Sequence, residues 1–482
     1  VPAAWMAALA LLAAWTTAMV KPGGGLGGMF QNMVKLGSTA SSAAVVQDRA
    51  PSWDTLTALL HDQSSADERS FRQQLHDGTL PHASALAKMR LFGKSEADAS
   101  RITLYRDTAA WCPYCEKVWL LLEEKQVPYM VEKVNMNCYG DKPAWFWAMQ
   151  PSGGIPVAKV DGKVIRESND IMMAIEQAYP ERPMLPREDS AKAVAVRPLL
   201  TLERQLFSSW FRWLTSGMND GAQRHNFLAL MDEVDAALAA QGGPFFLGED
   251  ISLVDCMFAP FLERMAASLP YYKGLLVRTN SRWPHVQCWF SAMEARPSFR
   301  YIRSDYYTHA HDLPPQVGRC YSTAEAEAYA AAIDGRDGSW RLPLTEKDAL
   351  EPLDCLGYDE GSARREAAER ILGNKEAIIS FCARGTGRPG FPPVSAPLSD
   401  PNASVDEGAI PQVDVALRHV VGVLLESPDA DGVSPGLHPQ TVTRTLGYLR
   451  DRISVPRDMS YPAARQLRAH LNFVIEKVNQ EA

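Results

Sequence analysis

The most informative pattern of apolar and polar positions lies in residues 101–186. Residues 102–107 alternate between the two kinds of side chain, which predicts a short strand, and apolar positions at helical spacing follow Pro113. Residues 129–136 predict a second strand, which runs parallel to the first because a helix connects them. Two more strands joined by a tight turn, and then a last helix, complete a predicted α/β domain.

Helical periodicity dominates the rest of the chain. Residues 187–306 carry apolar stripes at helical spacing, and Ser252 followed by Asp255 forms a capping box in which Asp takes the place of Glu. We therefore expect an all-α region here, in which Asp255 has a structural role. Residues 307–482 are expected to be mostly helical as well. Helical patterns in that part cover residues 324–333, 363–382, 413–425, 441–453 and 463–478.

Residues 1–21 form a hydrophobic segment at the start of the chain. The first 20 of them carry no charge and reach the length of about 20 residues that a helix needs to cross a bilayer. Their high alanine content makes them only weakly hydrophobic. A membrane anchor, the core of a targeting signal and an ordinary buried helix are the three interpretations. Residues 22–100 begin as a glycine-rich linker and continue as a helical arm without a chemical motif.

Composition narrows the function classes. The chain has 482 residues, which predicts about three domains at about 150 residues per domain. Its net charge of −8 argues against nucleic acid as a main partner. Eight cysteines in a chain of this length are too few for a disulfide scaffold. Two of them have the spacing Cys-x-x-Cys, which directs attention to thiol chemistry.

Cys112 and Cys115 lie where the first predicted strand gives way to a helix. The unpaired N–H groups and the dipole of a helix N-terminus stabilise a thiolate at Cys112. Cys115 follows one turn later, where it can attack a mixed disulfide formed on Cys112. A structural zinc pair and two inert thiols are the alternatives, but no second Cys or His pair follows at zinc-binding spacing. The sequence therefore favours redox or thiol chemistry and predicts no metal site.

Three motifs in this order resemble those of a known family. They are Cys-Pro-Tyr-Cys at residues 112–115, Ile155-Pro156 after a turn of small residues, and Glu167-Ser168 at the start of a helix. Together they resemble the glutathione-binding half of a glutathione S-transferase with a glutaredoxin-like site. The resemblance implies an α/β thioredoxin-like domain at 101–186, an all-α glutathione-transferase C-terminal domain at 187–306, and glutathione as co-substrate.

The resemblance also implies roles for individual residues. Pro156 matches a cis-proline that turns the main chain of Val157 toward the cysteinyl part of glutathione. Glu167 and Ser168 match the pair that holds the γ-glutamyl end, and Lys142 matches a lysine that neutralises the glycyl carboxylate. A helix cap and a surface charge are the alternatives for these positions. The full set of implied substrate-binding residues is Tyr114, Lys142, Pro156, Val157, Glu167 and Ser168, beside Cys112 and Cys115 as catalytic residues.

The C-terminal extension narrows the resemblance further. The segments SDYYTH…DLPPQ and VPRDMSYPAARQLRAHLN resemble the iota class of algae, cyanobacteria and mosses, which carries a mostly helical extension, here residues 307–482. His309 and His311 suggest a metal site, but their spacing fits no common one, and a satisfied cluster at the junction is the favoured interpretation. Three further cysteines, Cys320, Cys355 and Cys382, are expected to be buried thiols.

Two functional hypotheses follow. The first is a glutathione-dependent thiol transferase and reductase that acts through a mixed disulfide on Cys112. The second is a non-catalytic docking or structural subunit of a photosynthetic membrane complex that retains the transferase fold. Under both, we expect a chloroplast protein, in the stroma or associated with the thylakoid through residues 1–21 and the extension. Thiol-transfer activity distinguishes the two hypotheses.

Overall fold

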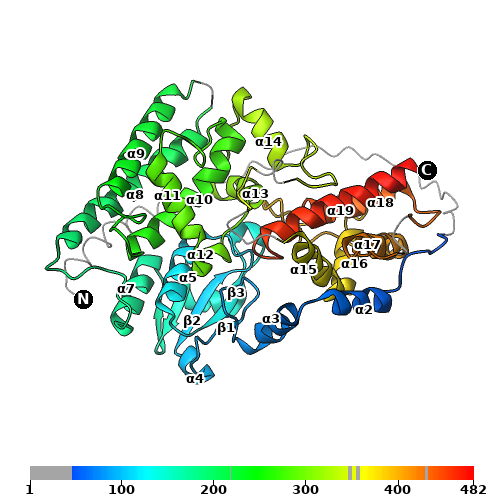
Figure 1. The fold of residues 1–482 in the computed structure, drawn as a ribbon, viewed down its shortest axis with the longest axis horizontal. Helices are drawn as coiled ribbons and strands as arrows, with labels where there is room; N and C mark the ends of the chain where they lie inside the picture. Colours follow the sequence, from blue (N-terminus) through cyan, green and yellow to red (C-terminus); the bar gives the residue numbers. More distant parts are fainter. Residues whose placement is uncertain (1–45, 218, 346–349, 354–358, 429–431, 482) are drawn as a thin grey trace.

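The structure is a computed structural model (Figure 1). It describes residues 46–217, 219–345, 350–353, 359–428 and 432–481. The hydrophobic segment 1–21, the linker up to residue 45 and Cys355 lie outside the described residues. Among the helices that are described, none combines the length and the apolar character needed to cross a membrane.

A five-stranded mixed sheet forms the centre of the first half of the chain. Its strands are β1 (Met89–Arg90), β2 (Ile102–Asp107), β3 (Tyr129–Val134), β4 (Val157–Val160) and β5 (Lys163–Ile165). They are arranged in the order β1-β3-β2-β4-β5. The pair β2 and β3 is parallel, as predicted, whereas the other three pairs are antiparallel. This is the thioredoxin-like α/β arrangement that the resemblance implies.

Short helices connect these strands and position the site. Helix α5 (Pro113–Lys125) joins β2 to β3, α6 (Ala144–Met149) precedes β4, and α7 (Ser168–Ala178) follows β5. Helix α5 packs against α7 on one side and against α10 (Leu253–Lys273) on the other. The N-terminus of α5 therefore lies between the sheet and the helical region.

The helical region shares a continuous apolar core with the sheet. Its helices are α8 (Ala191–Leu214), α9 (Gly221–Ala239), α10, α11 (Pro284–Glu294), α12 (Pro297–Arg300), α13 (Tyr306–Val317) and α14 (Glu327–Ile333). Helix α10 is buried along nearly its whole length. Asp255 stabilises its start, because it accepts hydrogen bonds from Ser252 N (2.8 Å) and from Trp289 Nε1 (3.0 Å). This agrees with the structural role expected for Asp255.

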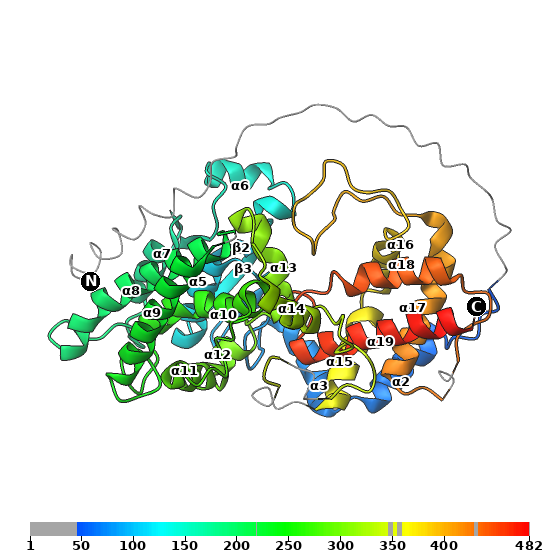
Figure 2. The same cartoon turned by 90° about the horizontal axis from the view of Figure 1, so that it is seen from above.

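The C-terminal extension builds a second apolar core. Its helices are α15 (Glu360–Leu372), α16 (Lys375–Ala383), α17 (Ile410–Leu424), α18 (Pro439–Arg450) and α19 (Tyr461–Gln480). Figure 2 shows the sheet and α8–α14 on one side of the molecule and the extension helices on the other. The pattern at 363–382, which runs through Gly373, is divided between two helices.

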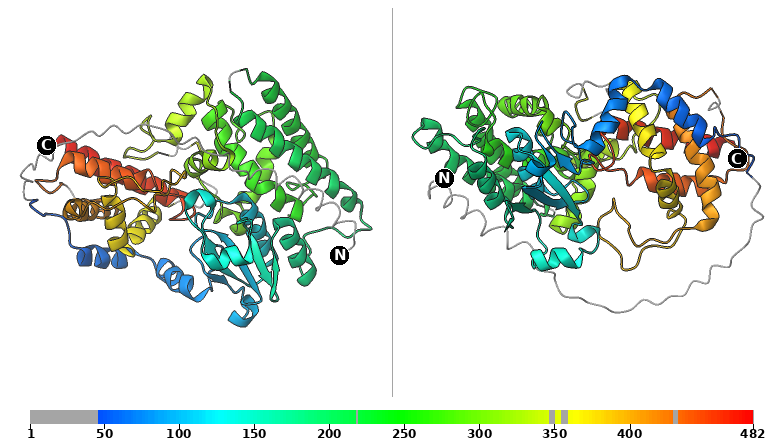
Figure 3. Two further views of the ribbon diagram at one scale, coloured as in Figure 1. Left: turned by 180° about the vertical axis from the view of Figure 1, so that it is seen from behind. Right: turned by 90° about the horizontal axis from the view of Figure 1, so that it is seen from below.

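The N-terminal arm contacts both halves of the molecule. The sequence did not predict these contacts. Its helix α2 (Trp53–Gln63) buries Leu56 and Leu60 in the core of the extension, beside α15 and α17. Figure 3 shows α2 and α3 (Ala66–Asp77) along the yellow and orange helices. Farther along, β1 pairs with β3 and forms one edge of the sheet. Helix α4 (Glu96–Ala99) lies between β1 and β2 in the chain. The arm thus connects the two cores.

Candidate functional site

Cys112 lies at the junction of β2 and α5, where the sequence placed it. It is the N-cap residue of α5, with Pro113 in the first helical position, and its carbonyl accepts from Glu116 N at 3.0 Å. Its side chain is 6% exposed. The Sγ atom lies 3.8 Å from the carbonyl oxygen of Ile155. A negative charge on this sulfur would face the free N–H groups at the start of α5, which favour an anion.

The loop opposite Cys112 has the geometry that the motif predicted. The peptide bond between Ile155 and Pro156 is cis. Val157 begins β4 directly after it and pairs with Tyr105 of β2. The end of this loop therefore presents main-chain groups beside the Cys112 sulfur.

Glu167 and Ser168 mark the start of α7. Glu167 is the N-cap residue and is exposed, whereas Ser168 is the first helical residue and is buried. Partial burial raises the pKa of Glu167, and Asp170 adds to the rise, while Lys117 opposes it. The side chain of Glu167 makes no capping hydrogen bond to the helix, although the residue occupies the N-cap position.

Lys142 is buried and not the surface charge of the alternative interpretation. Its Nζ atom donates to Asn137 Oδ1 at 2.5 Å. Burial lowers the pKa of Lys142, while the sulfurs of Cys138, Cys112 and Cys115 act in the opposite direction. The ammonium group therefore adds positive charge to the surroundings of the two motif cysteines.

Tyr114 lies where the first domain meets the helical region. Its ring contacts Phe261 of α10 edge-on, with 5.9 Å between the ring centroids. Arg204 of α8 lies over the same Phe261 ring at 4.7 Å and lowers the pKa of Tyr114, although burial raises it overall. The side chain of Tyr114 thus connects the cysteine motif to both α8 and α10.

Sequence reasoning missed a buried lysine at the site. Lys117 is 2% exposed, and its Nζ atom donates to Asn169 Oδ1 at 3.2 Å, next to Ser168. Burial lowers the pKa of Lys117 to about 7, and Arg204 contributes to the shift. A lysine on a helix usually indicates a solvated face, so the only available signal was its position one turn and a half after Cys112.

Cys115 is almost completely buried behind Cys112. Burial raises the pKa of its thiol well above the usual value, and the neighbouring Cys112 and Asp107 act in the same direction. The Sγ atoms of both cysteines and a carboxylate oxygen of Asp107 all lie within 4.8 Å of one another. A tetrahedral zinc site takes four ligands, and this cluster holds three. Asp107 ends β2 and was not singled out from the sequence.

A buried charge network contacts the loop that carries Cys112. Arg264 of α10 donates to the carbonyl of Trp111, lies 4.7 Å from its ring, and pairs with Glu116 of α5 at 2.8 Å. Burial raises the pKa of Glu116, as does the neighbouring Glu263. His309 of α13 lies 3.0 Å from Glu263, and burial lowers its pKa well below the usual value. The loop is thereby fixed to α10 and α13.

His311 agrees with a satisfied cluster at the junction, whereas both ring nitrogens of buried His309 lack a hydrogen-bond partner. His309 contacts Glu263, and His311 Nε2 lies 2.8 Å from Asp334. Neither belongs to a group of potential metal ligands in the part of the chain that the structure describes. Cys382 is buried as expected, whereas Cys320 is only half-buried.

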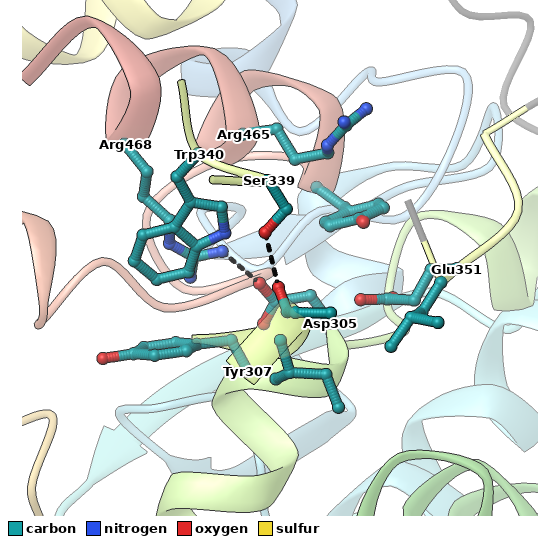
Figure 4. Close-up of a pocket in the computed structure, with 11 residues that line it drawn as sticks. Asp305, Tyr307, Ser339, Trp340, Glu351, Arg465 and Arg468 are labelled. Atoms are coloured by element: carbon teal, nitrogen blue, oxygen red, sulfur yellow. Dashed lines mark hydrogen bonds and ion pairs between the residues drawn. The ribbon is translucent and has the colours of Figure 1, made fainter. Parts of the chain in front are cut away.

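A small cavity lies between α13, α14, α19 and the residue pairs Ser339-Trp340 and Leu350-Glu351 (Figure 4). Its volume of about 20 Å³ is about that of one water molecule, too small for a peptide such as glutathione. Figure 4 shows Arg468 of α19 pointing at Asp305, to which it donates at 2.7 Å. The cavity marks the junction between the transferase part and the extension and is separate from the cysteine motif.

Selective alkylation tests the state of Cys112. We expect limiting iodoacetamide at mildly acidic pH to label Cys112 before Cys115, because burial raises the pKa of the Cys115 thiol well above its usual value. Cys288 of α11 is exposed and serves as the matched control. The measurement is peptide mass spectrometry over a pH series. Labelling of Cys112 that only parallels that of Cys288 across the series would contradict the thiolate interpretation.

The chain matches known proteins over the same region. Residues 111–178 match the glutathione S-transferase N-terminal domain, and residues 219–292 match the glutathione S-transferase C-terminal domain. Glutathione S-transferase DHAR2 of Arabidopsis thaliana is 34% identical over 197 residues, which are 40% of this chain and 84% of the relative. The chloroplastic glutathione S-transferase DHAR3 of the same plant is 32% identical over 197 residues, 40% of this chain and 69% of the relative.

Among solved structures, glutathione transferase Omega 3C from Trametes versicolor aligns with 28% identity and a TM-score of 0.38. The alignment covers 44% of this chain and 93% of the Trametes versicolor chain. The two domain matches, the sheet with its cis-proline loop, and a relative covered over most of its length identify the family. The chain belongs to the glutathione S-transferase family of enzymes, which use glutathione as co-substrate.

Proposed function

We propose that this enzyme is a thiol transferase and reductase that acts through a mixed disulfide between Cys112 and glutathione. The observation that carries the proposal is the placement of a cysteine, and not a serine or tyrosine, at the N-terminus of α5 opposite the Pro156 loop. A cysteine thiolate can form a disulfide with glutathione, which hydroxyl groups cannot do. Such a site favours removal of glutathione from mixed disulfides and related reductions.

In the proposed reaction, the Cys112 thiolate attacks the glutathione sulfur of a mixed disulfide. The bond between that sulfur and the substrate sulfur breaks, and the substrate leaves as a thiol after it takes up a proton. A second glutathione then attacks the Cys112 mixed disulfide, which regenerates Cys112 and releases glutathione disulfide. Lys142 and the start of α5 would stabilise the sulfur anions that form in both steps.

The proposed binding mode uses the groups around this sulfur. The main chain of Val157 would pair with the cysteinyl part of glutathione in the manner of an added strand. Ser168 would donate to the γ-glutamyl carboxylate at the start of α7, and Glu167 would accept from its ammonium group. Lys142 would neutralise the glycyl carboxylate, and Tyr114 would form part of the wall toward α8 and α10. Lys117, through Asn169, would hold the start of α7 in place.

Replacement of Ser168 tests the binding mode. We expect Ser168→Ala to weaken glutathione binding by about 1–3 kcal/mol, the usual cost of an unmade hydrogen bond to a charged group. Glu167→Gln is expected to act similarly through the ammonium contact. The measurement is the dissociation constant by calorimetry.

Ser190→Ala provides the matched control for that test. Ser190 also stands at a helix start, where it caps α8 and accepts from Ala193 N at 3.3 Å, but it lies outside the proposed site. Its replacement is expected to lower stability without changing glutathione binding. Dissociation constants that are equal in the Ser168, Glu167 and Ser190 variants and in the wild type would place the ligand elsewhere.

We further propose that the enzyme is of an iota-like class and functions in the chloroplast. The Cys-Pro-Tyr-Cys site, the helical extension and the segments SDYYTH…DLPPQ and VPRDMSYPAARQLRAHLN support the class. Chloroplastic relatives such as DHAR3 of Arabidopsis thaliana support the compartment. Retention of a fluorescent fusion of the full-length precursor in isolated chloroplasts tests the location. Fractionation of those chloroplasts then separates a stromal enzyme from one associated with the thylakoid membrane or a membrane complex.

A further inference from the structure

Asp107 is a buried carboxylate beside the two cysteines, and one of its two oxygens has no hydrogen-bond partner. The residue is 1% exposed. Its Oδ2 atom accepts from Trp111 N at 2.5 Å, whereas Oδ1 has no partner. An unsatisfied carboxylate oxygen in a protein interior is costly, and such groups call for a functional or solvent explanation. Here, an oxygen of this carboxylate lies within 4.8 Å of Cys112 Sγ and Cys115 Sγ.

Cys115 requires a proton acceptor before it can act as a nucleophile. Its thiol is nearly inaccessible to solvent, and burial raises its pKa well above the usual value. A thiol is a poor nucleophile until it loses its proton, and buried Cys115 has no bulk water to receive that proton. A separation of up to 4.8 Å corresponds to direct contact or to one bridging water, and such distances often shorten when the reaction intermediate forms.

We propose that Asp107 accepts the proton of Cys115 when Cys115 resolves the mixed disulfide on Cys112. This assigns a dithiol branch to the enzyme, and it rests on the proposed function, because it requires glutathione on Cys112. Asp107 would be inactive in the first step and act in the second. The residue would thus decide whether the intermediate is resolved within the protein or by a second glutathione.

The step balances as follows. The S–H bond of Cys115 breaks, and its proton goes to Asp107, while the sulfur uses its electron pair to form a bond with Cys112 Sγ. The bond between Cys112 Sγ and the glutathione sulfur breaks, and glutathione leaves with that electron pair and takes a proton from Asp107 or from solvent. In this step the Cys115 sulfur is oxidised and the glutathionyl sulfur is reduced, while the Cys112 sulfur remains at the oxidation level of a disulfide. Two further glutathione molecules reduce the Cys112–Cys115 disulfide and become glutathione disulfide.

Other charged and titratable groups lie near Asp107 and interact with it electrostatically. Arg106 beside it on β2 donates to the Asp107 carbonyl at 2.9 Å, and Asp107 raises the pKa of Arg106, although burial lowers it overall. The groups that interact electrostatically with Asp107 from the packed elements are Cys115 of α5, Lys133 of β3, Cys138 after β3 and Asp312 of α13. Arg106 and Lys133 are the cations of this set, and Asp312 is a second carboxylate.

The experiment follows the two steps separately in the full chain. Reduced protein is mixed with glutathione disulfide, which loads Cys112 and releases one glutathione. Rapid acid quenching and mass spectrometry then follow the loaded protein and its conversion to the Cys112–Cys115 disulfide over a pH series. In Asp107→Asn, loading is expected to persist, whereas conversion at neutral pH is expected to slow about tenfold or more. The difference should narrow at alkaline pH, where hydroxide can deprotonate Cys115.

Glu351→Gln is the matched control. Glu351 is also buried, at 5% exposed, and also has one carboxylate oxygen without a partner, while the other accepts from Tyr306 N at 2.8 Å. It does not belong to the cluster around the two sulfurs, so its replacement is expected to leave the conversion rate and its pH profile as in the wild type. Conversion in Asp107→Asn that equals the control, or that is slowed by the same factor at every pH, would overturn the proposal.

Two further outcomes are informative. If Asp107→Asn does not fold, the pH dependence of the conversion rate in the wild type tests the proposal. A rate that reaches a plateau by neutral pH supports a carboxylate acceptor, and a rate that keeps rising in proportion to hydroxide refutes it. If wild-type Cys112 does not load at all, the proposed function fails. If Cys112 loads but never converts, the proposed function stands and only the role of Asp107 is refuted.

Discussion

Cys112→Ser is expected to abolish thiol transfer. A serine hydroxyl at the start of α5 is far too weakly acidic to ionise near neutral pH, and an alkoxide would form no disulfide with glutathione. Structural disruption is expected to be small, because the replacement is nearly isosteric and the contact of the sulfur to the Ile155 carbonyl is long, at 3.8 Å. The measurement is the steady-state rate of glutathione-dependent reduction of a small glutathione mixed disulfide.

Cys115→Ser is the matched variant for this experiment. It alters the other cysteine of the same motif, yet external glutathione can still resolve the intermediate on Cys112, so most of the activity toward small mixed disulfides is expected to remain. Activity that persists in Cys112→Ser would refute the assignment of the nucleophile. A wild-type chain without activity, combined with loss of a membrane or protein partner on removal of residues 1–21 or of the extension, would support the docking hypothesis.

Arg468→Met is expected to cause the largest loss of stability outside the active site. Arg468 and Asp305 are 1% and 0% exposed and form a 2.7 Å ion pair between α19 and the start of α13. Removal of the arginine leaves a buried carboxylate without its counter-charge, which typically costs about 3–5 kcal/mol. The guanidinium also lies over the rings of Tyr307 and Trp340, and its packing is lost as well.

Arg341→Met provides the control for this prediction. Arg341 makes a 3.0 Å ion pair with Glu476 of α19, but both side chains are largely exposed. Pairs of this kind contribute about 0–1 kcal/mol. The free energies of unfolding in urea should therefore differ clearly between the two variants, and the double replacement Asp305→Asn with Arg468→Met should recover part of the loss. Equal losses in the two single variants would show that the junction does not depend on the buried pair.

Buried polar contacts connect the extension to the loop that carries Cys112. Asp305 begins α13, and two residues after Tyr307 the same helix carries His309, which contacts Glu263 beside Arg264. Arg264 in turn holds the carbonyl of Trp111, the residue before Cys112. A continuous set of buried polar contacts therefore runs from α19 through α13 and α10 to the catalytic loop. Changes at Arg468 should be examined for activity as well as for stability.

The sequence predicted those parts of the fold that have strong local signals. The alternation at 102–107 became β2 with the same bounds, and the capping box at Ser252 became the start of α10. Cys112 and Ser168 lie at helix starts and Pro156 follows a cis peptide bond, as expected, because each motif depends on a local turn or helix start. In each of these places, neighbouring residues determine the conformation.

The parts that were missed depend on contacts between distant residues. Leu56 of α2 packs into a core built mainly from residues after 360, and no local pattern indicates such a partner. β1 has only two residues, too few for any periodicity. Lys117 and Asp107 are polar residues that usually face solvent, and only the assembled structure shows that both are buried near the cysteines. Their importance follows from burial, which composition and spacing do not reveal.

The central claim is that Cys112 forms a mixed disulfide with glutathione. The most direct test incubates the Cys115→Ser chain, in which the intermediate cannot be resolved internally, with glutathione disulfide and determines the modified residue by peptide mass spectrometry. We expect one glutathionyl group per chain, located on Cys112 and removed by excess glutathione. An unmodified chain, or a glutathionyl group on exposed Cys288 in place of Cys112, would contradict the claim.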